Sequence, residues 1–112
     1  MGIDRNKLRL NHILEATRHI AEFLVNVSKD EFESDYEKQS AVIRQIEIIG
    51  EAASKLSREF TDSKKQVDWP RVIGMRHKMI HDYFEVEVSI VWETIQNDVP
   101  KLRNQIEEVI KS

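Results

Sequence analysis

Four side chains between residues 76 and 83 have the chemistry for proton transfer and for phosphate binding. They are Arg76, His77, His81 and Tyr83. An imidazole titrates near neutral pH, so it can take up or release a proton there. A guanidinium keeps its charge and can hold two phosphate oxygens at once. Cleavage of RNA without a metal needs a base for the ribose 2′-OH, an acid for the leaving 5′-oxygen and a cation for the developing charge.

The chemistry favours His81 for proton transfer and Arg76 for the phosphate. One histidine serves poorly as both base and acid, so a second is needed, either His77 or a copy supplied across a dimer interface. On a continuous helix, Arg76 and Tyr83 point nearly the same way, because they are seven residues apart. His81 would lie one turn from His77, on an adjoining face. The spacing therefore predicts one cleft wall that carries all four groups.

A structural role explains the same residues without any chemistry. In this interpretation Arg76 pairs with Asp82 or with a neighbouring helix, and His81 is a satisfied core side chain. Two glutamates one turn apart, Glu47 and Glu51, are similarly interpreted as the solvated edge of a buried stripe. Spacing alone leaves the catalytic and the structural interpretations open.

A metal site is a further alternative, because His77 and His81 have the i, i+4 spacing of zinc ligands on a helix. Lys78 stands where zinc proteases carry a glutamate, and no third histidine follows. A cation beside a divalent metal is electrostatically costly, so we predict no metal and no cofactor. His12 and His19 share a face of the first predicted helix and are expected to be solvated.

The charge of the chain is unevenly distributed. Its 112 residues carry 17 basic and 20 acidic side chains, a formal net charge of −3. Residues 64–83 have a surplus of three positive charges, which leaves −6 for the rest. The overall balance argues against a protein that coats nucleic acid through bulk charge. It is compatible with a small basic cleft.

Hydrophobic periodicity predicts helices throughout the chain. Apolar residues recur every three or four positions over residues 4–27, 35–56, 68 to 82 or 84, and from 89 onward. Asp68 and Pro70 are typical of a helix start, Asp30 or Ser34 is expected to cap the second helix, and Pro100 predicts a kink in the last one. Residues 26–34, 61–67 and 85–88 are predicted connections, the last one extended. We therefore predict an all-α, antiparallel four- to five-helix bundle with a single domain over residues 1–112.

Composition excludes several classes of protein. There is no cysteine, which excludes disulfide scaffolds, thiol catalysis and cysteine zinc sites. No apolar run approaches the roughly 18 residues of a membrane span. The first residues show no secretory signal. We expect a cytoplasmic protein with no membrane association.

Several segments resemble the HepT branch of the HEPN families. They are residues 68–84 (DWPRVIGMRHKMIHDYF), 90–95 (IVWETI), 98–100 (DVP), 41–53 (AVIRQIEIIGEAA) and 11–16 (NHILEA). The family signature is Arg, four to six residues and His, with a Tyr two residues later in this branch. Arg76, His81 and Tyr83 match it. Most relatives carry a polar residue, commonly Asn, directly after the Arg, where this chain has His77.

The resemblance implies an all-α endoribonuclease that works without metal, with Arg76 and His81 as catalytic residues and His77 in support. It implies the toxin of a toxin–antitoxin pair, active on RNA and assembled as a homodimer or higher oligomer with a shared cleft. The implied antitoxin is a minimal nucleotidyltransferase that attaches adenylate groups to Tyr83. Negative charge added there would block the phosphate path. The alternative is a non-catalytic HEPN module that docks a partner or substrate for the nucleotidyltransferase.

Overall fold

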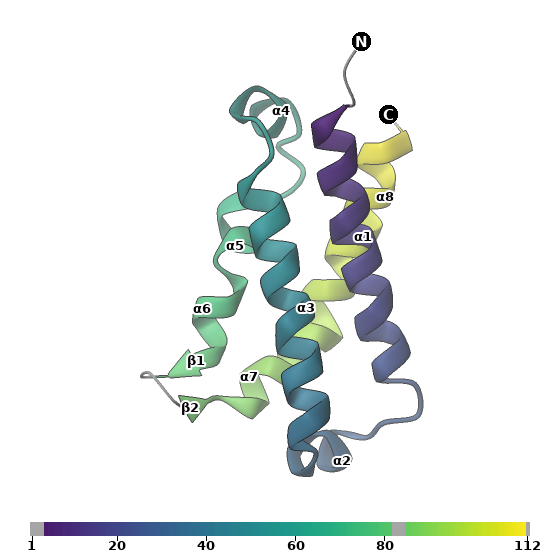
Figure 1. Ribbon diagram of the computed structural model, residues 1–112, viewed down its shortest axis with the longest axis vertical. Helices are drawn as coiled ribbons and strands as arrows, with labels where there is room; N and C mark the ends of the chain where they lie inside the picture. The colour runs from purple at the N-terminus through teal and green to yellow at the C-terminus, as the bar shows by residue number, and fades with distance from the viewer. Residues whose placement is uncertain (1–3, 82–84, 112) are drawn as a thin grey trace.

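The computed structural model describes residues 4–81 and 85–111, which are almost entirely helical (Figure 1). The helices are α1 (Arg5–Phe23), α2 (Lys29–Ser34), α3 (Tyr36–Ser54), α4 (Arg58–Ser63), α5 (Trp69–Ile73), α6 (Met75–Met79), α7 (Val88–Glu93), the π-helical turn η1 (Thr94–Asp98) and α8 (Val99–Lys111). Two short strands, β1 (Ile80–His81) and β2 (Glu85–Val86), pair antiparallel.

The long helices form an antiparallel bundle, as predicted. Helix α3 lies at its centre and packs against α1 on one flank and against α5 and α6 on the other. The segment from α7 to α8 returns along the bundle, and α8 packs against α1 (Figure 1). The all-α fold class is confirmed, while dimerisation stays a prediction. Among the described residues, no helix is both long and apolar enough to cross a membrane.

The apolar stripes predicted for the helices form the core. The buried residues come from α1 (Leu10, Ile13, Ala16, Ile20), α3 (Val42, Ile46, Ile49, Ala52, Ala53), and η1 with α8 (Ile95, Val99, Leu102, Ile106, Val109). Their burial supplies the main driving force for the bundle. Trp69 is buried and Trp92 packs on the buried Phe32, with ring centroids 5.5 Å apart.

Side-chain caps fix where the first five helices, α1 to α5, begin. Asp68 accepts a hydrogen bond from the Arg71 amide at 3.2 Å, so α5 starts as predicted. The predicted cap for the second long helix, Asp30 or Ser34, is wrong. Asp35 caps α3 through the Lys38 amide at 3.0 Å, because residues 29–34 form the separate helix α2. A short helix, α4, likewise occupies part of the predicted loop at 61–67.

The third predicted helix does not continue to Asp82 or Phe84. It is divided at Gly74 into α5 and α6, and it ends at Met79. The Met79 carbonyl accepts a hydrogen bond from the Glu87 amide at 2.7 Å, so the chain turns into a hairpin there. The extended connection predicted at 85–88 supplies strand β2, in agreement with its β-branched residues. Asp82 and Phe84 lie outside the described residues.

A π-helical turn lies just before Pro100 in the last helical segment. Pro100 has no amide hydrogen, and the Val99 amide bonds to the Thr94 carbonyl five residues back, which is the π-helical pattern. The turn η1 therefore lies just before Pro100, and the kink predicted there stays a prediction.

A close approach between α3 and the end of α5 depends on Gly50. A β-carbon built at Gly50 would lie 3.0 Å from the carbonyl oxygen of Ile73. This separation is tighter than an ordinary van der Waals contact, and the opposing atom belongs to the backbone. The absence of a side chain at residue 50 therefore sets how closely α5 lies against α3.

Substitution Gly50→Ala is expected to destabilise the protein by about 1–3 kcal/mol through overpacking. Replacing glycine by alanine at an open helical position would instead stabilise the protein by up to about 1 kcal/mol. The sign of the change in the free energy of unfolding therefore tells the two situations apart. Urea unfolding measures the change. Ser54→Ala on the exposed side of α3 is the control, with an expected change within about 0.5 kcal/mol. A Gly50→Ala protein more stable than the wild type would contradict the close approach.

Candidate active site

Helix α6 presents three consecutive polar side chains to solvent. Arg76, His77 and Lys78 are exposed, whereas Met75 and Met79 are buried against the bundle. With Val72 of α5, the two methionines form an apolar stripe at spacings of three and four. The segment therefore has one core face and one open polar face, and the burial of Met75 and Met79 holds the polar face outward.

Arg76 forms an ion pair with Glu47 of α3. Its Nε lies 2.8 Å from Oε2 of Glu47, and the two side chains are 46% and 31% exposed. Pairing with a neighbouring helix was one prediction of the structural interpretation, and the structure shows it. Nearly half of the Arg76 side chain still faces solvent, so a phosphate can reach it.

Glu47 was interpreted from the sequence as a solvated edge. Its side chain is 31% exposed, and the structure adds a partner that the sequence did not indicate, Arg76. Glu51, one turn further on, does have that role, since it is exposed and pairs with Lys55 at 3.4 Å. The signal that separates the two glutamates is Gly50, because a glycine inside a helix indicates the close approach of another backbone. Glu47 lies one turn before Gly50, on the side where α5 and α6 pack.

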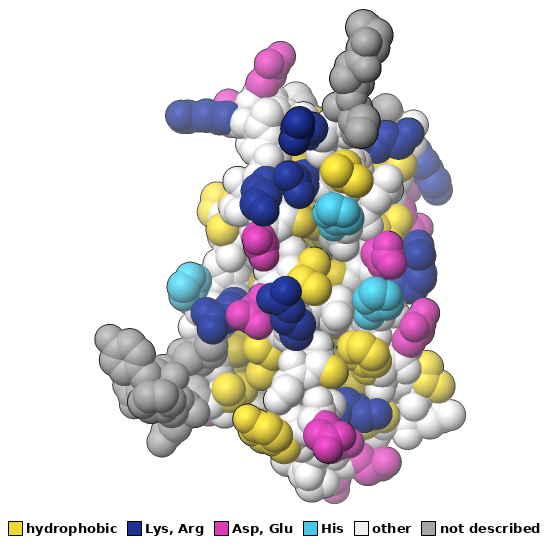
Figure 2. Space-filling view, in the orientation of Figure 1, with side chains coloured by type: hydrophobic (Ala, Val, Ile, Leu, Met, Phe, Trp, Pro, Cys, Tyr) yellow, Lys and Arg dark blue, Asp and Glu magenta, His cyan; other side chains and the backbone are white. Residues whose placement is uncertain are grey.

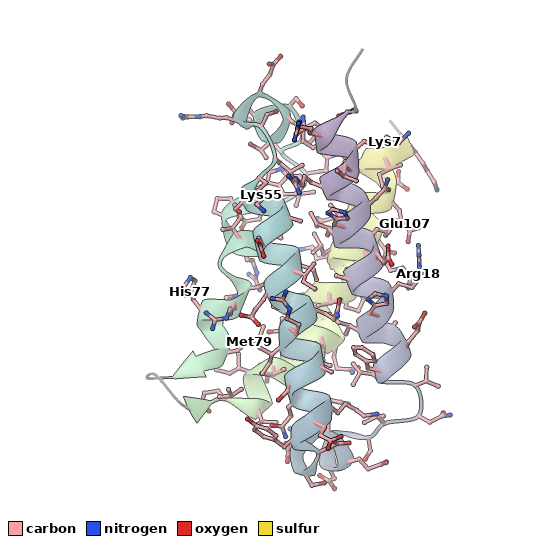
Figure 3. The ribbon with its side chains drawn as sticks, viewed as in Figure 1. Lys7, Arg18, Lys55, His77, Met79 and Glu107 are labelled. Carbon is pink, nitrogen blue, oxygen red and sulfur yellow. The ribbon has the colours of Figure 1, made fainter. Side chains whose placement is uncertain are left out.

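His77 lies on the outer side of α6. Figure 3 shows its side chain directed away from α3, whereas Met79 lies toward α3. His77 is therefore accessible to a ligand in solution, as the predicted supporting role requires.

The other two predicted residues fall in the hairpin that follows α6. The backbone of His81 belongs to β1, opposite Glu85, but its side chain is outside the described part of the chain, as is all of Tyr83. The predicted one-turn relation of His77 to His81 is wrong, because α6 ends at Met79 and His81 belongs to β1. The predicted shared face of Arg76 and Tyr83 involves a residue outside the described part of the chain.

Acidic side chains from neighbouring elements offset the positive surplus of this segment. Arg71 holds both carboxylate oxygens of Asp98 in η1, at 3.1 and 3.2 Å, in addition to the pair between Arg76 and Glu47. Figure 2 shows basic and acidic side chains interspersed over α3 and α6. The surface is therefore one of alternating charges, not a uniformly basic patch.

Grooves flank α5 on two sides. One is lined by Arg71, Asp98 and Lys101, between α5 and the start of α8. The other is lined by Arg58, Lys65 and Ile73, between α4 and α5. Met75 of α6 lines the first groove, whereas the second groove ends at Ile73, the last residue of α5.

The histidines of α1 lie apart from this site. His12 is exposed, as predicted, but His19 is half-buried and its Nδ1 lies 3.2 Å from Oε1 of Gln45. Within residues 4–81 and 85–111, no group of three or more histidine or acidic side chains is arranged to hold a metal ion.

Comparison with known proteins identifies the family. The model of the family described as "Ribonuclease HepT-like" matches residues 13–109. This chain belongs to the HepT-like ribonuclease family. The matched range includes α6, the hairpin and Glu47. The resemblance inferred from the sequence is confirmed.

Curated relatives agree with this assignment. The chain is 38% identical over 102 residues to "Putative RNase TTE0752" of Caldanaerobacter subterraneus, covering 91% of each chain. It is 37% identical over 102 residues to "Probable ribonuclease HepT" of Thermococcus cleftensis, covering 91% of this chain and 93% of the relative. No significant match was found among solved structures.

The hairpin is expected to depend on the hydrogen bond from the Glu87 amide to Met79. Glu87 has a φ of −79°, which proline accepts, so Glu87→Pro removes the donor with little strain. Losing a bond worth about 1 kcal/mol should speed amide hydrogen exchange at residues 80, 81, 85 and 86 by roughly threefold to tenfold. Glu87→Ala keeps the amide and is the matched control. Equal exchange in both variants would mean that this bond does not hold the hairpin.

Proposed function

We propose that this chain is an endoribonuclease that cleaves RNA without a metal ion, and that it is the toxin of a toxin–antitoxin pair. Arg76 and His81 are its catalytic residues, His77 supports them, and Tyr83 is the site of silencing. The observation that carries the proposal is the exposed Arg76 of α6, five residues before His81, within a chain of the HepT-like ribonuclease family.

The proposed reaction is an internal transesterification. His81 takes the proton of the ribose 2′-OH while the 2′-oxygen attacks phosphorus, and the bond to the 5′-oxygen breaks as that oxygen receives a proton from a second imidazole. The products are a 2′,3′-cyclic phosphate and a 5′-hydroxyl. Arg76 stabilises the negative charge that develops on the phosphorane oxygens. His77, exposed on α6, or His81 of a second protomer supplies the acid.

The proposed antitoxin is a minimal nucleotidyltransferase that transfers adenylate from ATP to the phenolic oxygen of Tyr83, releasing pyrophosphate. The transfer to this oxygen adds a phosphodiester with one negative charge close in sequence to Arg76 and His81. That charge would compete with the RNA phosphate for the guanidinium.

Replacing either catalytic residue should abolish cleavage. Arg76→Ala and His81→Ala are each expected to lower the rate of RNA cleavage by at least about 100-fold, since each removes charge stabilisation or proton transfer. Expression of the wild-type chain alone should arrest bacterial growth, and His81→Ala should relieve the arrest. Gel assays with EDTA present measure the cleavage.

The matched controls are His12→Ala on α1 and Arg103→Ala on α8, which pairs with Glu107 at 3.2 Å on its own helix. Both should cleave RNA as the wild type does. Full activity of Arg76→Ala and His81→Ala would overturn the catalytic assignment and favour the non-catalytic docking module.

Silencing is expected to require the Tyr83 hydroxyl. Coexpression with a minimal nucleotidyltransferase encoded next to this chain should add mass increments of adenylate size, and it should abolish RNA cleavage. Intact-protein mass spectrometry checks the increments. Tyr83→Phe should carry none and stay active, whereas Tyr36→Phe, at an exposed tyrosine of α3, should be modified like the wild type. Increments that persist in Tyr83→Phe would place the modification elsewhere.

A further inference from the structure

The ion pair between Glu47 and Arg76 joins α3 to α6 through two residues that are 29 positions apart in the chain. Arg76 contributes the Nε edge of its guanidinium, 2.8 Å from Glu47 Oε2. No hydrogen bond joins its two terminal nitrogens to another described residue. Glu47 therefore engages the Nε edge, and no other residue in the described part of the chain competes with a ligand for the two terminal nitrogens.

The backbones that carry this pair are held by a second contact one turn away. Gly50 lies one turn after Glu47 on α3, and Ile73 lies one turn before Arg76. The approach of residue 50 to the Ile73 carbonyl sets the distance between these helices. A β-carbon built at Gly50 would lie 3.0 Å from that carbonyl oxygen. Successive turns of α3 thus meet successive turns of the α5–α6 segment.

The pair is too exposed to be important for folding. Ion pairs between side chains that are 46% and 31% exposed add little to stability, because water screens them. Such a pair does restrict a long, flexible arginine to few rotamers. Its main consequence is where the guanidinium lies, and for Arg76 that decides whether a phosphate meets both terminal nitrogens.

We propose that Glu47 is a positioning residue of the active site. It holds the Nε edge of Arg76, so that the terminal nitrogens are presented to the scissile phosphate of the RNA. This inference rests on the proposed ribonuclease function. An acidic side chain is unexpected on a surface that binds phosphate, and this role explains why Glu47 lies there.

Kinetics of RNA cleavage by purified variants test the proposal. Glu47→Ala is expected to lower kcat/KM by about tenfold, because a freed guanidinium must be ordered in each turnover. Glu47→Gln keeps an acceptor oxygen and should recover most of the loss. Glu51→Ala is the matched control: it breaks a similar ion pair one turn along α3 and should leave kcat/KM unchanged. Thermal unfolding of all three variants should match that of the wild type.

A double-mutant comparison separates positioning from a general structural effect. In an Arg76→Lys background, which keeps the charge but lacks Nε, Glu47→Ala should change kcat/KM by less than about twofold, since the two residues act as a unit. A tenfold loss in both backgrounds would overturn the proposal, because Glu47 would then act independently of Arg76.

Two further outcomes also overturn it. Faster cleavage by Glu47→Ala would mean that the glutamate competes with phosphate for Arg76. Full activity of Glu47→Ala, with Arg76→Ala inactive, would leave the ribonuclease function standing without a role for Glu47. Absence of cleavage by the wild-type chain would instead remove the proposed function itself, and this inference with it.

Discussion

The backbone of the α5–α6 segment lies directly against α3 at Gly50, and the position of the candidate site depends on that contact. A β-carbon at residue 50 would come within 3.0 Å of the Ile73 carbonyl oxygen. Because none is present, α6 comes close enough for Arg76 to meet Glu47 at 2.8 Å. The location of the Arg76 guanidinium, the candidate catalytic cation, is therefore set by the packing of Gly50 against Ile73, three residues away from Arg76 in the chain.

The candidate catalytic motif also crosses a boundary between two kinds of backbone. Arg76 lies on a helix whose apolar stripe is buried in the core, whereas His81 belongs to a strand. The amide of Glu87, the residue that follows β2, stabilises this change by donating a hydrogen bond to the Met79 carbonyl. Helix α6 therefore ends within the four residues that separate Arg76 from His81. Their spacing in the sequence does not place the two residues on one face of a helix.

Features that depend on local sequence were predicted well, and those that depend on distant partners were not. The stripes of α1, α3 and α8 follow from periodicity, and the start of α5 follows from capping by Asp68. The end of α6 at Met79 was missed because it depends on pairing with residues 85–87. Glu47 was missed because its partner lies 29 residues away. Of the predicted site, Arg76 and His77 are exposed as required, and the side chains of His81 and Tyr83 lie outside the described part.

The central claim is that Arg76 and His81 cleave RNA through attack by the ribose 2′-hydroxyl. The most direct measurement is mass spectrometry of the ends that the purified chain produces from a defined RNA in the presence of EDTA. We expect a 2′,3′-cyclic phosphate on one fragment and a 5′-hydroxyl on the other, and no cleavage where the nucleotide on the 5′ side of the bond lacks its 2′-hydroxyl. A 5′-phosphate on the products, or cleavage at such a 2′-deoxy position, would contradict it.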